Sequence, residues 1–113
     1  MTLAQIRKHA LSFAGVSEEP HFDRTSFRVN GKIFVTAKPS ESQIHVFVPE
    51  EVREPALAMH PGIVSKLYWG GKVVGVRVEL PMVESGVVRD LVAQAWQSKA
   101  TKGRGSARAR SGS

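Results

Sequence analysis

Four consecutive residues, His21-Phe22-Asp23-Arg24, bring together side chains that could form a small polar site. A carboxylate next to an imidazole can orient the ring and decide which nitrogen carries the proton. Asp23 would orient His21 in such a site. The alternative, which the pattern favours, is structural: Phe22 anchors a connecting segment and His21 caps a backbone group.

A glycine pair followed by lysine, Gly70-Gly71-Lys72, invites comparison with a phosphate-binding loop. A P-loop requires a longer glycine pattern, a hydroxyl after the lysine and a following helix. Here an alternating strand pattern follows instead. The glycines therefore predict a tight turn, and Trp69 is expected to wedge between a helix and the sheet. Ligand binding beside Trp69 is the alternative.

Residues for metal binding or covalent catalysis are scarce. The chain has no cysteine, which excludes disulfides, thiolate metal sites and cysteine nucleophiles. The histidines His9, His45 and His60 fall in different predicted elements and lack the paired spacing of a zinc site. No serine lies in a nucleophile-elbow motif. The sequence therefore predicts no catalytic residue, metal site or cofactor.

Phosphate contact is the chemistry that the basic residues support. The net charge is +6, and five of the sixteen basic residues follow Ser98, where no acidic residue occurs. Residues 1–98 hold eleven basic and ten acidic residues, so this part is nearly neutral as a whole. Whether it binds a polyanion then depends on how charge is sorted between its faces.

Candidates for phosphate contacts lie on two predicted hairpins and in the C-terminal segment. They are Arg28, Lys32, Lys72, Arg77, Lys102, Arg104, Arg108 and Arg110. Arg28, Lys32 and Arg77 would track phosphates if they shared one open face of a sheet. The alternative is solvated charge at strand edges, which discourages pairing between molecules.

Local patterns predict the elements that would position these residues. Thr2 and Gln5 fit a capping box for a helix over residues 3–13, and Gly15 supplies a left-handed stop. Residues 16–24 are interpreted as a polar connector.

Asn30-Gly31 between two strand-like runs predicts a hairpin, because both residues accept positive φ. In a two-residue turn the facing pairs are Val29 with Lys32, Arg28 with Ile33, and Phe27 with Phe34. Each face of that hairpin would then carry both apolar and polar side chains. Either each face is partly covered, or a bulge changes the register.

Two further strands and two helices are predicted before the basic segment. Residues 43–48 alternate as a third strand, and Pro49-Glu50-Glu51 begins a second helix that Pro55 should kink or delay. Residues 73–80 form the best half-buried strand. Ser85 is the expected N-cap of a last helix, whose apolar face carries Val88, Leu91, Val92, Ala95 and Trp96.

The predicted order is helix, three strands, helix, one or two strands, helix. Strands joined by hairpins imply an antiparallel sheet, and three amphipathic helices need a surface to cover, so an α+β two-layer sandwich follows. We expect one domain over residues 1–98 and a disordered basic tail over residues 99–113. No apolar run approaches the roughly 18 residues of a membrane span, so a cytoplasmic location and no membrane partner are expected.

Short motifs from about residue 3 to residue 97 are specific in combination, although each is weak alone. They are Ala10-Leu11-Ser12-Phe13 with Gly15-Val16, Glu19-Pro20-His21-Phe22, Phe27-Arg28-Val29 with Gly31-Lys32, His45-Val46-Phe47, His60-Pro61, Tyr68-Trp69-Gly70-Gly71-Lys72 with Val76, and Ala95-Trp96. Together they resemble the MmcQ/YjbR family, small bacterial proteins with a double-wing or frataxin-like α+β fold. Pro55 departs from the uninterrupted second helix that is usual in that family.

The resemblance implies DNA binding, because the fold looks like the double-wing DNA-contacting domain of a phage transcription factor. This is an analogy of fold, and fold alone does not establish function. The resemblance carries over no catalytic residues. A frataxin-like architecture also has an iron-binding relative, but iron needs clustered carboxylates, and the first helix offers Gln5, Arg7 and Lys8 instead.

Two hypotheses follow. The first is a non-enzymatic monomer that binds DNA weakly and largely without sequence specificity, and that keeps some binding when residues 99–113 are deleted. The second is a small adaptor that binds a protein or small ligand near His21, Asp23 and Trp69. An exposed hollow beside Trp69 would favour the second hypothesis, and a fully packed Trp69 would count against it. An enzyme, the third alternative, has no residue in its support.

Overall fold

The computed structural model describes residues 1–108 of the chain, with side chains described through Thr101. Its elements in chain order are α1 (Leu3–Leu11), β1 (Val16–His21), β2 (Arg24–Val29), β3 (Lys32–Ala37), β4 (Gln43–Val46), α2 (Glu50–Met59), β5 (Val64–Trp69), β6 (Lys72–Glu79) and α3 (Ser85–Arg108). The strands form one antiparallel sheet in the order β1-β2-β3-β4-β6-β5. The predicted α+β architecture is confirmed.

The register across the sheet separates an apolar face from a polar one. One row of paired residues is fully buried and consists of Phe27, Val35, Val46 and Val76. Because successive side chains of a strand point to opposite faces, the adjacent row lies on the other side of the sheet. That row is polar and consists of Ser26, Thr36, His45 and Arg77. We call the side that carries this polar row the solvent face.

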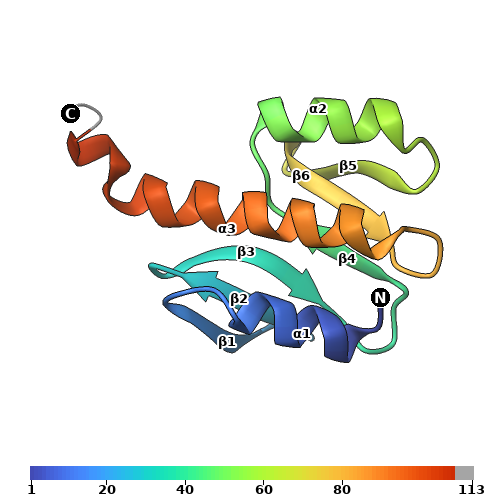
Figure 1. The fold of residues 1–113 in the computed structure, drawn as a ribbon, viewed down its shortest axis with the longest axis horizontal. Coiled ribbons are helices and arrows are strands. Elements are labelled where there is room, and N and C mark those ends of the chain that lie inside the picture. The colour runs from blue at the N-terminus through green and yellow to red at the C-terminus, as the bar shows by residue number, and fades with distance from the viewer. Residues whose placement is uncertain (109–113) are drawn as a thin grey trace.

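The three helices pack on the apolar face and make the second layer. Figure 1 shows α3 crossing the middle of the sheet between α1 and α2. One core cluster joins the strands to Ile6 and Ala10 of α1 and to the predicted apolar stripe of α3. Trp96 of that stripe stacks on Phe13 at a ring distance of 5.0 Å and donates a hydrogen bond to the Ala14 carbonyl at 3.1 Å.

The segment predicted as a polar connector is the edge strand β1, so that prediction was wrong. Val16–His21 pairs along its length with β2. Glu18, on this strand, accepts hydrogen bonds from Arg7 of α1 and from Thr25 of β2, which satisfies its carboxylate beside the core. Pro20 is tolerated because an edge strand has a backbone side that needs no donor. Polar partners on neighbouring elements thus replace the apolar alternation that usually reveals a strand.

The β2–β3 hairpin has the predicted turn and, beyond it, a bulge. Asn30 and Gly31 take φ values of 55° and 74°, as a two-residue hairpin turn requires. The first two facing pairs are confirmed, but Phe27 pairs with Val35 and not with Phe34. Phe34 is therefore an extra residue on β3. The bulge explains the mixed faces of the predicted register, because Phe27, Phe34 and Val35 are all fully buried.

The helix ends differ from prediction at several points. The capping box of Thr2 and Gln5 is confirmed, with bonds of 3.2 and 2.9 Å, but α1 ends at Leu11. Helix α2 begins at Glu50 without delay and contains Pro55. Helix α3 begins at Ser85 itself and runs to Arg108, beyond the predicted domain boundary at residue 98. None of these helices combines the length and apolarity needed to cross a membrane within the described residues.

Candidate nucleic-acid interface

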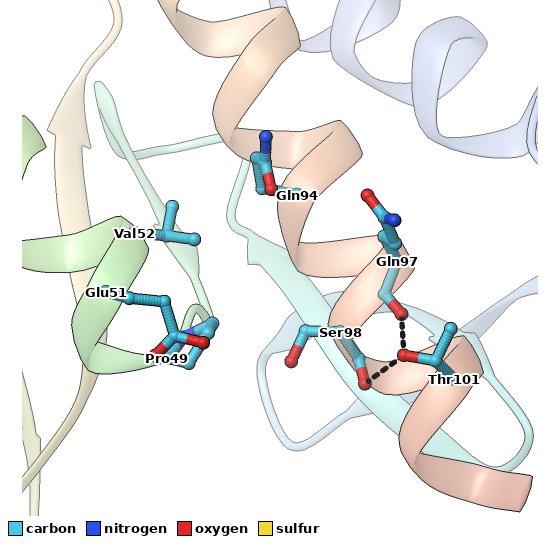
Figure 2. A pocket seen from close by; sticks show the side chains of 7 residues that line it. All are labelled: Pro49, Glu51, Val52, Gln94, Gln97, Ser98 and Thr101. Atoms are coloured by element: carbon cyan, nitrogen blue, oxygen red, sulfur yellow. Dashed lines mark hydrogen bonds between the residues drawn. The ribbon is translucent and has the colours of Figure 1, made fainter. Parts of the chain in front are cut away.

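A groove between α2 and α3 is the first concave surface to consider (Figure 2). It is lined by Pro49, Glu51 and Val52 on one side and by Gln94, Gln97, Ser98 and Thr101 of α3 on the other. Among the described residues of this lining, only Glu51 is charged. A groove whose described lining carries only a negative charge is a poor candidate for phosphate contacts.

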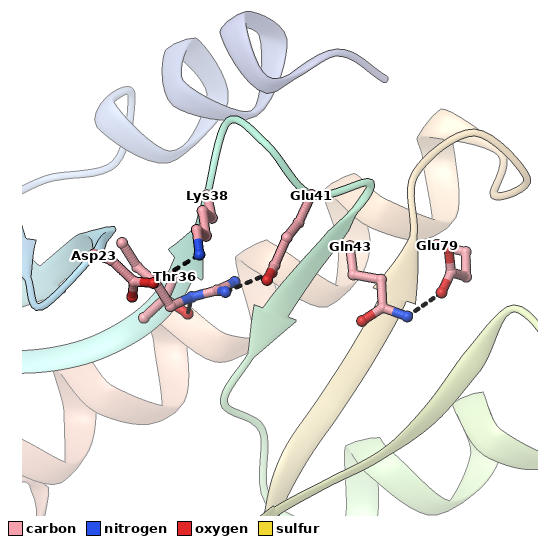
Figure 3. A network of polar contacts seen from close by, with 7 residues as sticks. Asp23, Thr36, Lys38, Glu41, Gln43 and Glu79 are labelled. Atoms are coloured by element: carbon pink, nitrogen blue, oxygen red, sulfur yellow. Dashed lines mark hydrogen bonds and ion pairs between the residues drawn. The ribbon is translucent and has the colours of Figure 1, made fainter.

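The solvent face is the alternative, and near β1 its cations are paired with acids (Figure 3). Arg24 Nη1 lies 2.7 Å from Glu41 Oε1, and Lys38 Nζ lies 2.7 Å from Asp23 Oδ2. These contacts lower the pKa of both carboxyl groups, because each carboxylate accepts a charge-assisted hydrogen bond. This part of the face therefore presents pairs of opposite charge and little net attraction for phosphate.

Arg28 belongs to the same paired region. Its Nε donates to the Ser26 hydroxyl at 3.0 Å, and its Nη2 donates to the Pro20 carbonyl at 3.4 Å. Glu19 lies 4.0 Å from Nε. These contacts hold the guanidinium across β1 and β2, so part of its hydrogen-bonding capacity is already used within the protein.

The tips of the β2–β3 and β5–β6 hairpins have a different charge pattern. Lys32 and Lys72 adjoin the two turns and are exposed, and Arg77 is exposed on the polar row. In the described part of the chain, no ion pair involves any of these three side chains. Among the described ion pairs the cations of the sheet are thus sorted: those near the β1–β2 turn are compensated, whereas Lys32 and Lys72 at the two tips are not. Arg77, which faces His45 in the body of β6, also has no acidic partner among these ion pairs.

A cleft of about 370 Å³ lies between the two hairpin tips. Lys32 and Ile33 line it from one hairpin and Trp69 and Val74 from the other, together with Arg28, Gly31, Phe47 and Lys99. Lys99 comes from α3, which is tied to the first hairpin by a hydrogen bond from Asn30 Nδ2 to the Ala100 carbonyl at 3.0 Å. We call this space the wing cleft. Of its described lining residues, three are cationic and none is acidic.

A second hollow of about 370 Å³ adjoins the wing cleft and shares Phe47 and Trp69 with it. Its aromatic residues are His21, Phe22, His45, Phe47 and Trp69, and its other residues are Asp23, Arg24 and Thr36. We call it the aromatic hollow. The rings of Phe47 and Trp69 meet edge to face at 5.1 Å, which sets Trp69 between the two spaces.

A scan against protein-family models matches the YjbR family over residues 11–98. The chain belongs to the YjbR family. No curated protein gives a match. The YjbR match covers β1 to β6 and the first part of α3, so both hairpins and the aromatic hollow lie inside the matched range, and the wing cleft does so except for Lys99.

The YjbR domain corrects two structural expectations for aromatic residues. Trp69 does not wedge between helix and sheet, since it is 51% exposed on the solvent face. Phe22 does not anchor a connector, since it is 93% exposed in the β1–β2 turn. Whether such rings are buried depends on packing between elements that are distant in sequence, which local patterns do not report.

The predicted site residues separate into three groups. Lys32 and Lys72 lie at the two tips and Arg28 lines the wing cleft, whereas Arg77 pairs with His45 and Ser65 toward the other end of β6. Asp23 bonds Lys38, and in the described residues no hydrogen bond joins it to His21. Three of the predicted residues belong to α3, where only their backbone is described: Lys102, Arg104 and Arg108. Arg110 lies outside the described residues. The sequence analysis did not identify Lys99, Thr36 or His45 as site residues. Thr36 and His45 are brought together by the pairing of β3 with β4, and Lys99 reaches the wing cleft from α3.

His45 is the one group near the hollows with a large pKa shift. Burial, together with Arg24 and Arg77, lowers the pKa of His45 to about 4, against a weaker opposite effect of Glu41. The imidazole is therefore neutral at neutral pH in the folded YjbR domain. It can then offer one hydrogen-bond donor and one acceptor to the hollow.

We expect folding stability to decrease as the pH falls from about 6.5 to about 4. In this window the unfolded chain protonates His45 while the folded chain excludes the proton. The expected loss is about 1 to 2 kcal/mol after allowance for the half-exposed position of the ring. The lowered pKa values of Glu18, Asp23 and Glu41 act only below about pH 4.5, so urea titrations between pH 6.5 and 4.5 isolate the histidine. His45→Gln should flatten the curve there, and an unchanged slope would contradict the assignment.

Proposed function

We propose that this chain is a non-enzymatic DNA-binding protein that contacts phosphates through its two hairpin tips. The proposal is supported by the sorting of charge on the sheet. Among the described residues, Lys32 and Lys72 at the tips lack the acidic partners that Arg24 and Lys38 have, and so does Arg77 farther along β6. An uncompensated cation releases condensed counterions from DNA when it contacts a phosphate, and this release drives non-specific binding. Binding should therefore be weak, salt-dependent and largely independent of sequence.

The C-terminal part of α3 is expected to add to this attraction. Lys99 lines the wing cleft, and the chain continues past it with Lys102, Arg104, Arg108 and Arg110 and without an acidic residue. A variant that ends at Thr101 keeps Lys99 and the Asn30–Ala100 contact but loses those four charges. It should still bind duplex DNA with a shallower salt dependence. Complete loss of binding would reduce the function to a charged C-terminal segment.

The hairpin tips are tested directly by the double variant Lys32→Gln/Lys72→Gln. We expect the slope of log affinity against log salt concentration to become shallower by about 1.8, because each phosphate contact contributes about 0.9. Fluorescence anisotropy with a labelled short duplex over a salt series measures the slope.

The matched control is Lys8→Gln/Lys66→Gln, which removes two exposed lysines from α1 and β5. Its slope should change much less. Equal changes in the two double variants would mean that net charge alone, and not the hairpin tips, determines binding.

A second function, the binding of a small ligand or protein near His21 and Trp69, is supported by one observation. Trp69 is half exposed beside a concave space, as that hypothesis requires.

A further inference from the structure

The aromatic hollow and the wing cleft differ in chemistry although they share a wall. Trp69 and Phe47 line both spaces. On one side of Trp69 lie Phe22 and His45, and on the other lie Lys32 and Lys99. An aromatic compartment thus adjoins a cationic compartment, and Trp69 stands between them.

Phe22 has an unusual conformation for the residue that borders the aromatic hollow. It takes φ = 58°, a left-handed value that is strained for a bulky side chain, and it remains 93% exposed. Glycine or asparagine would fit such a turn without strain. A strained, solvated phenylalanine gains nothing for folding, and strain of this kind concentrates at binding sites.

Polar groups in the aromatic hollow offer both donors and acceptors. Nη2 of Arg24 is buried and has no hydrogen-bond partner among the described residues, while Nε bonds Thr36 and Nη1 bonds Glu41. A buried donor without an acceptor is unfavourable and is relieved by an acceptor from a ligand. The neutral imidazole of His45 supplies a donor and an acceptor at the same wall.

From this juxtaposition we infer that the two hollows together bind one unpaired nucleotide of a single-stranded nucleic acid. The base stacks on Trp69 in the aromatic hollow, and its phosphate lies in the wing cleft near Lys32 and Lys99. The inference deepens the proposed function, on which it rests, by naming single strands as the preferred ligand.

We infer a single-stranded ligand because the base must be free to stack on Trp69. In a duplex the bases are stacked and paired, so a half-exposed ring on a sheet cannot stack on them. Single-stranded loops and ends present free base faces, and proteins bind these by aromatic stacking beside a cationic track along the backbone. Stacking tolerates any base, which agrees with binding that is largely non-specific.

The test compares three probes of equal length: a single-stranded oligothymidylate of about ten residues, its abasic counterpart, and a duplex. The abasic strand keeps the phosphate charge and lacks the bases. The oligothymidylate should bind about 5- to 100-fold more tightly than the abasic strand, the range expected for one stacked base. In NMR spectra the indole N–H of Trp69 should shift, and that of Trp96, which bonds Ala14, should not.

Variants separate stacking from folding. Trp69→Ala should abolish the preference for bases, whereas Tyr68→Ala, which removes the exposed neighbouring ring outside both hollows, should retain it. Phe22→Gly removes a ring that borders the aromatic hollow, so it should weaken the preference for the strand with bases. Because glycine also relieves the strained turn, the variant should lose no stability.

Each other outcome has a definite meaning. Equal binding of the oligothymidylate and the abasic strand, or tighter binding of the duplex, overturns the inference and leaves phosphate binding by the hairpin tips intact. Failure of all three probes to bind overturns the proposed function itself. Thymidine monophosphate that binds as tightly as the oligothymidylate identifies a free nucleotide as the ligand and overturns the single-strand inference.

Discussion

Gly75→Ala is expected to destabilise the folded chain by about 3 to 5 kcal/mol. A Cβ atom at this position would lie 2.1 Å from the Val46 carbonyl oxygen and 2.9 Å from the Phe47 Cα. Both are backbone atoms of β4 and the residue after it, so no side-chain rotation can make room. Strands β4 and β6 would have to separate where Val46 pairs with Val76, in the middle of the sheet. Urea unfolding at neutral pH measures the loss.

The matched control for this substitution is Gly86→Ala in the first turn of α3. A Cβ there meets nothing within 4 Å, and alanine is the better helix former. We expect Gly86→Ala to be neutral or to stabilise the fold by up to about 1 kcal/mol. A cost for Gly75→Ala below about 1 kcal/mol would show that β4 and β6 are not held at this separation.

The close approach at Gly75 also has a consequence for the candidate site. Phe47 directly follows β4 and lines both hollows, and its amide donates to the Phe34 carbonyl at 3.0 Å. A shift of β4 away from β6 would therefore move the shared wall of the wing cleft and the aromatic hollow. The glycine serves the site by allowing the backbone that carries Phe47 to lie against β6.

Features that depend on near neighbours in the chain could be predicted from the sequence. The Asn30–Gly31 turn, the capping box of Thr2 and the apolar stripe of α3 are set by residues within a few positions of one another. Turn chemistry and helical periodicity act at this range, and they sufficed to establish the α+β class. The edge strand β1 was not predicted, because Glu18 on it is satisfied by partners on α1 and β2. The local alternation of apolar and polar residues does not report such contacts.

The candidate site could be predicted only in part, because it is assembled across the sheet. Lys32 and Lys72 were identified by charge next to turn residues, and they do lie at the tips. Thr36, His45 and Trp69 meet in one hollow through the order of four different strands, and no spacing along the chain encodes that meeting. The near-neutral total for residues 1–98 also conceals the separation between paired charges near β1 and unpaired charges at the tips.

Phe34→Ala is expected to cost about 3 to 5 kcal/mol, the usual range for removing a fully buried phenylalanine. Phe34 is the extra residue of the β3 bulge and has no exposed surface. Its ring is in the core only because the bulge turns it away from the solvent face, so the truncation leaves a cavity beside Phe27 and Val35. Urea unfolding should show a lower midpoint with an unchanged denaturant dependence.

The neighbouring Ile33→Ala is the control, since Ile33 faces Arg28 across the hairpin, is only partly buried and lines the wing cleft. Because the bulge assigns one of these adjacent residues to the core and the other to the cleft, a larger loss for Ile33→Ala than for Phe34→Ala would contradict the register on which both hollows depend.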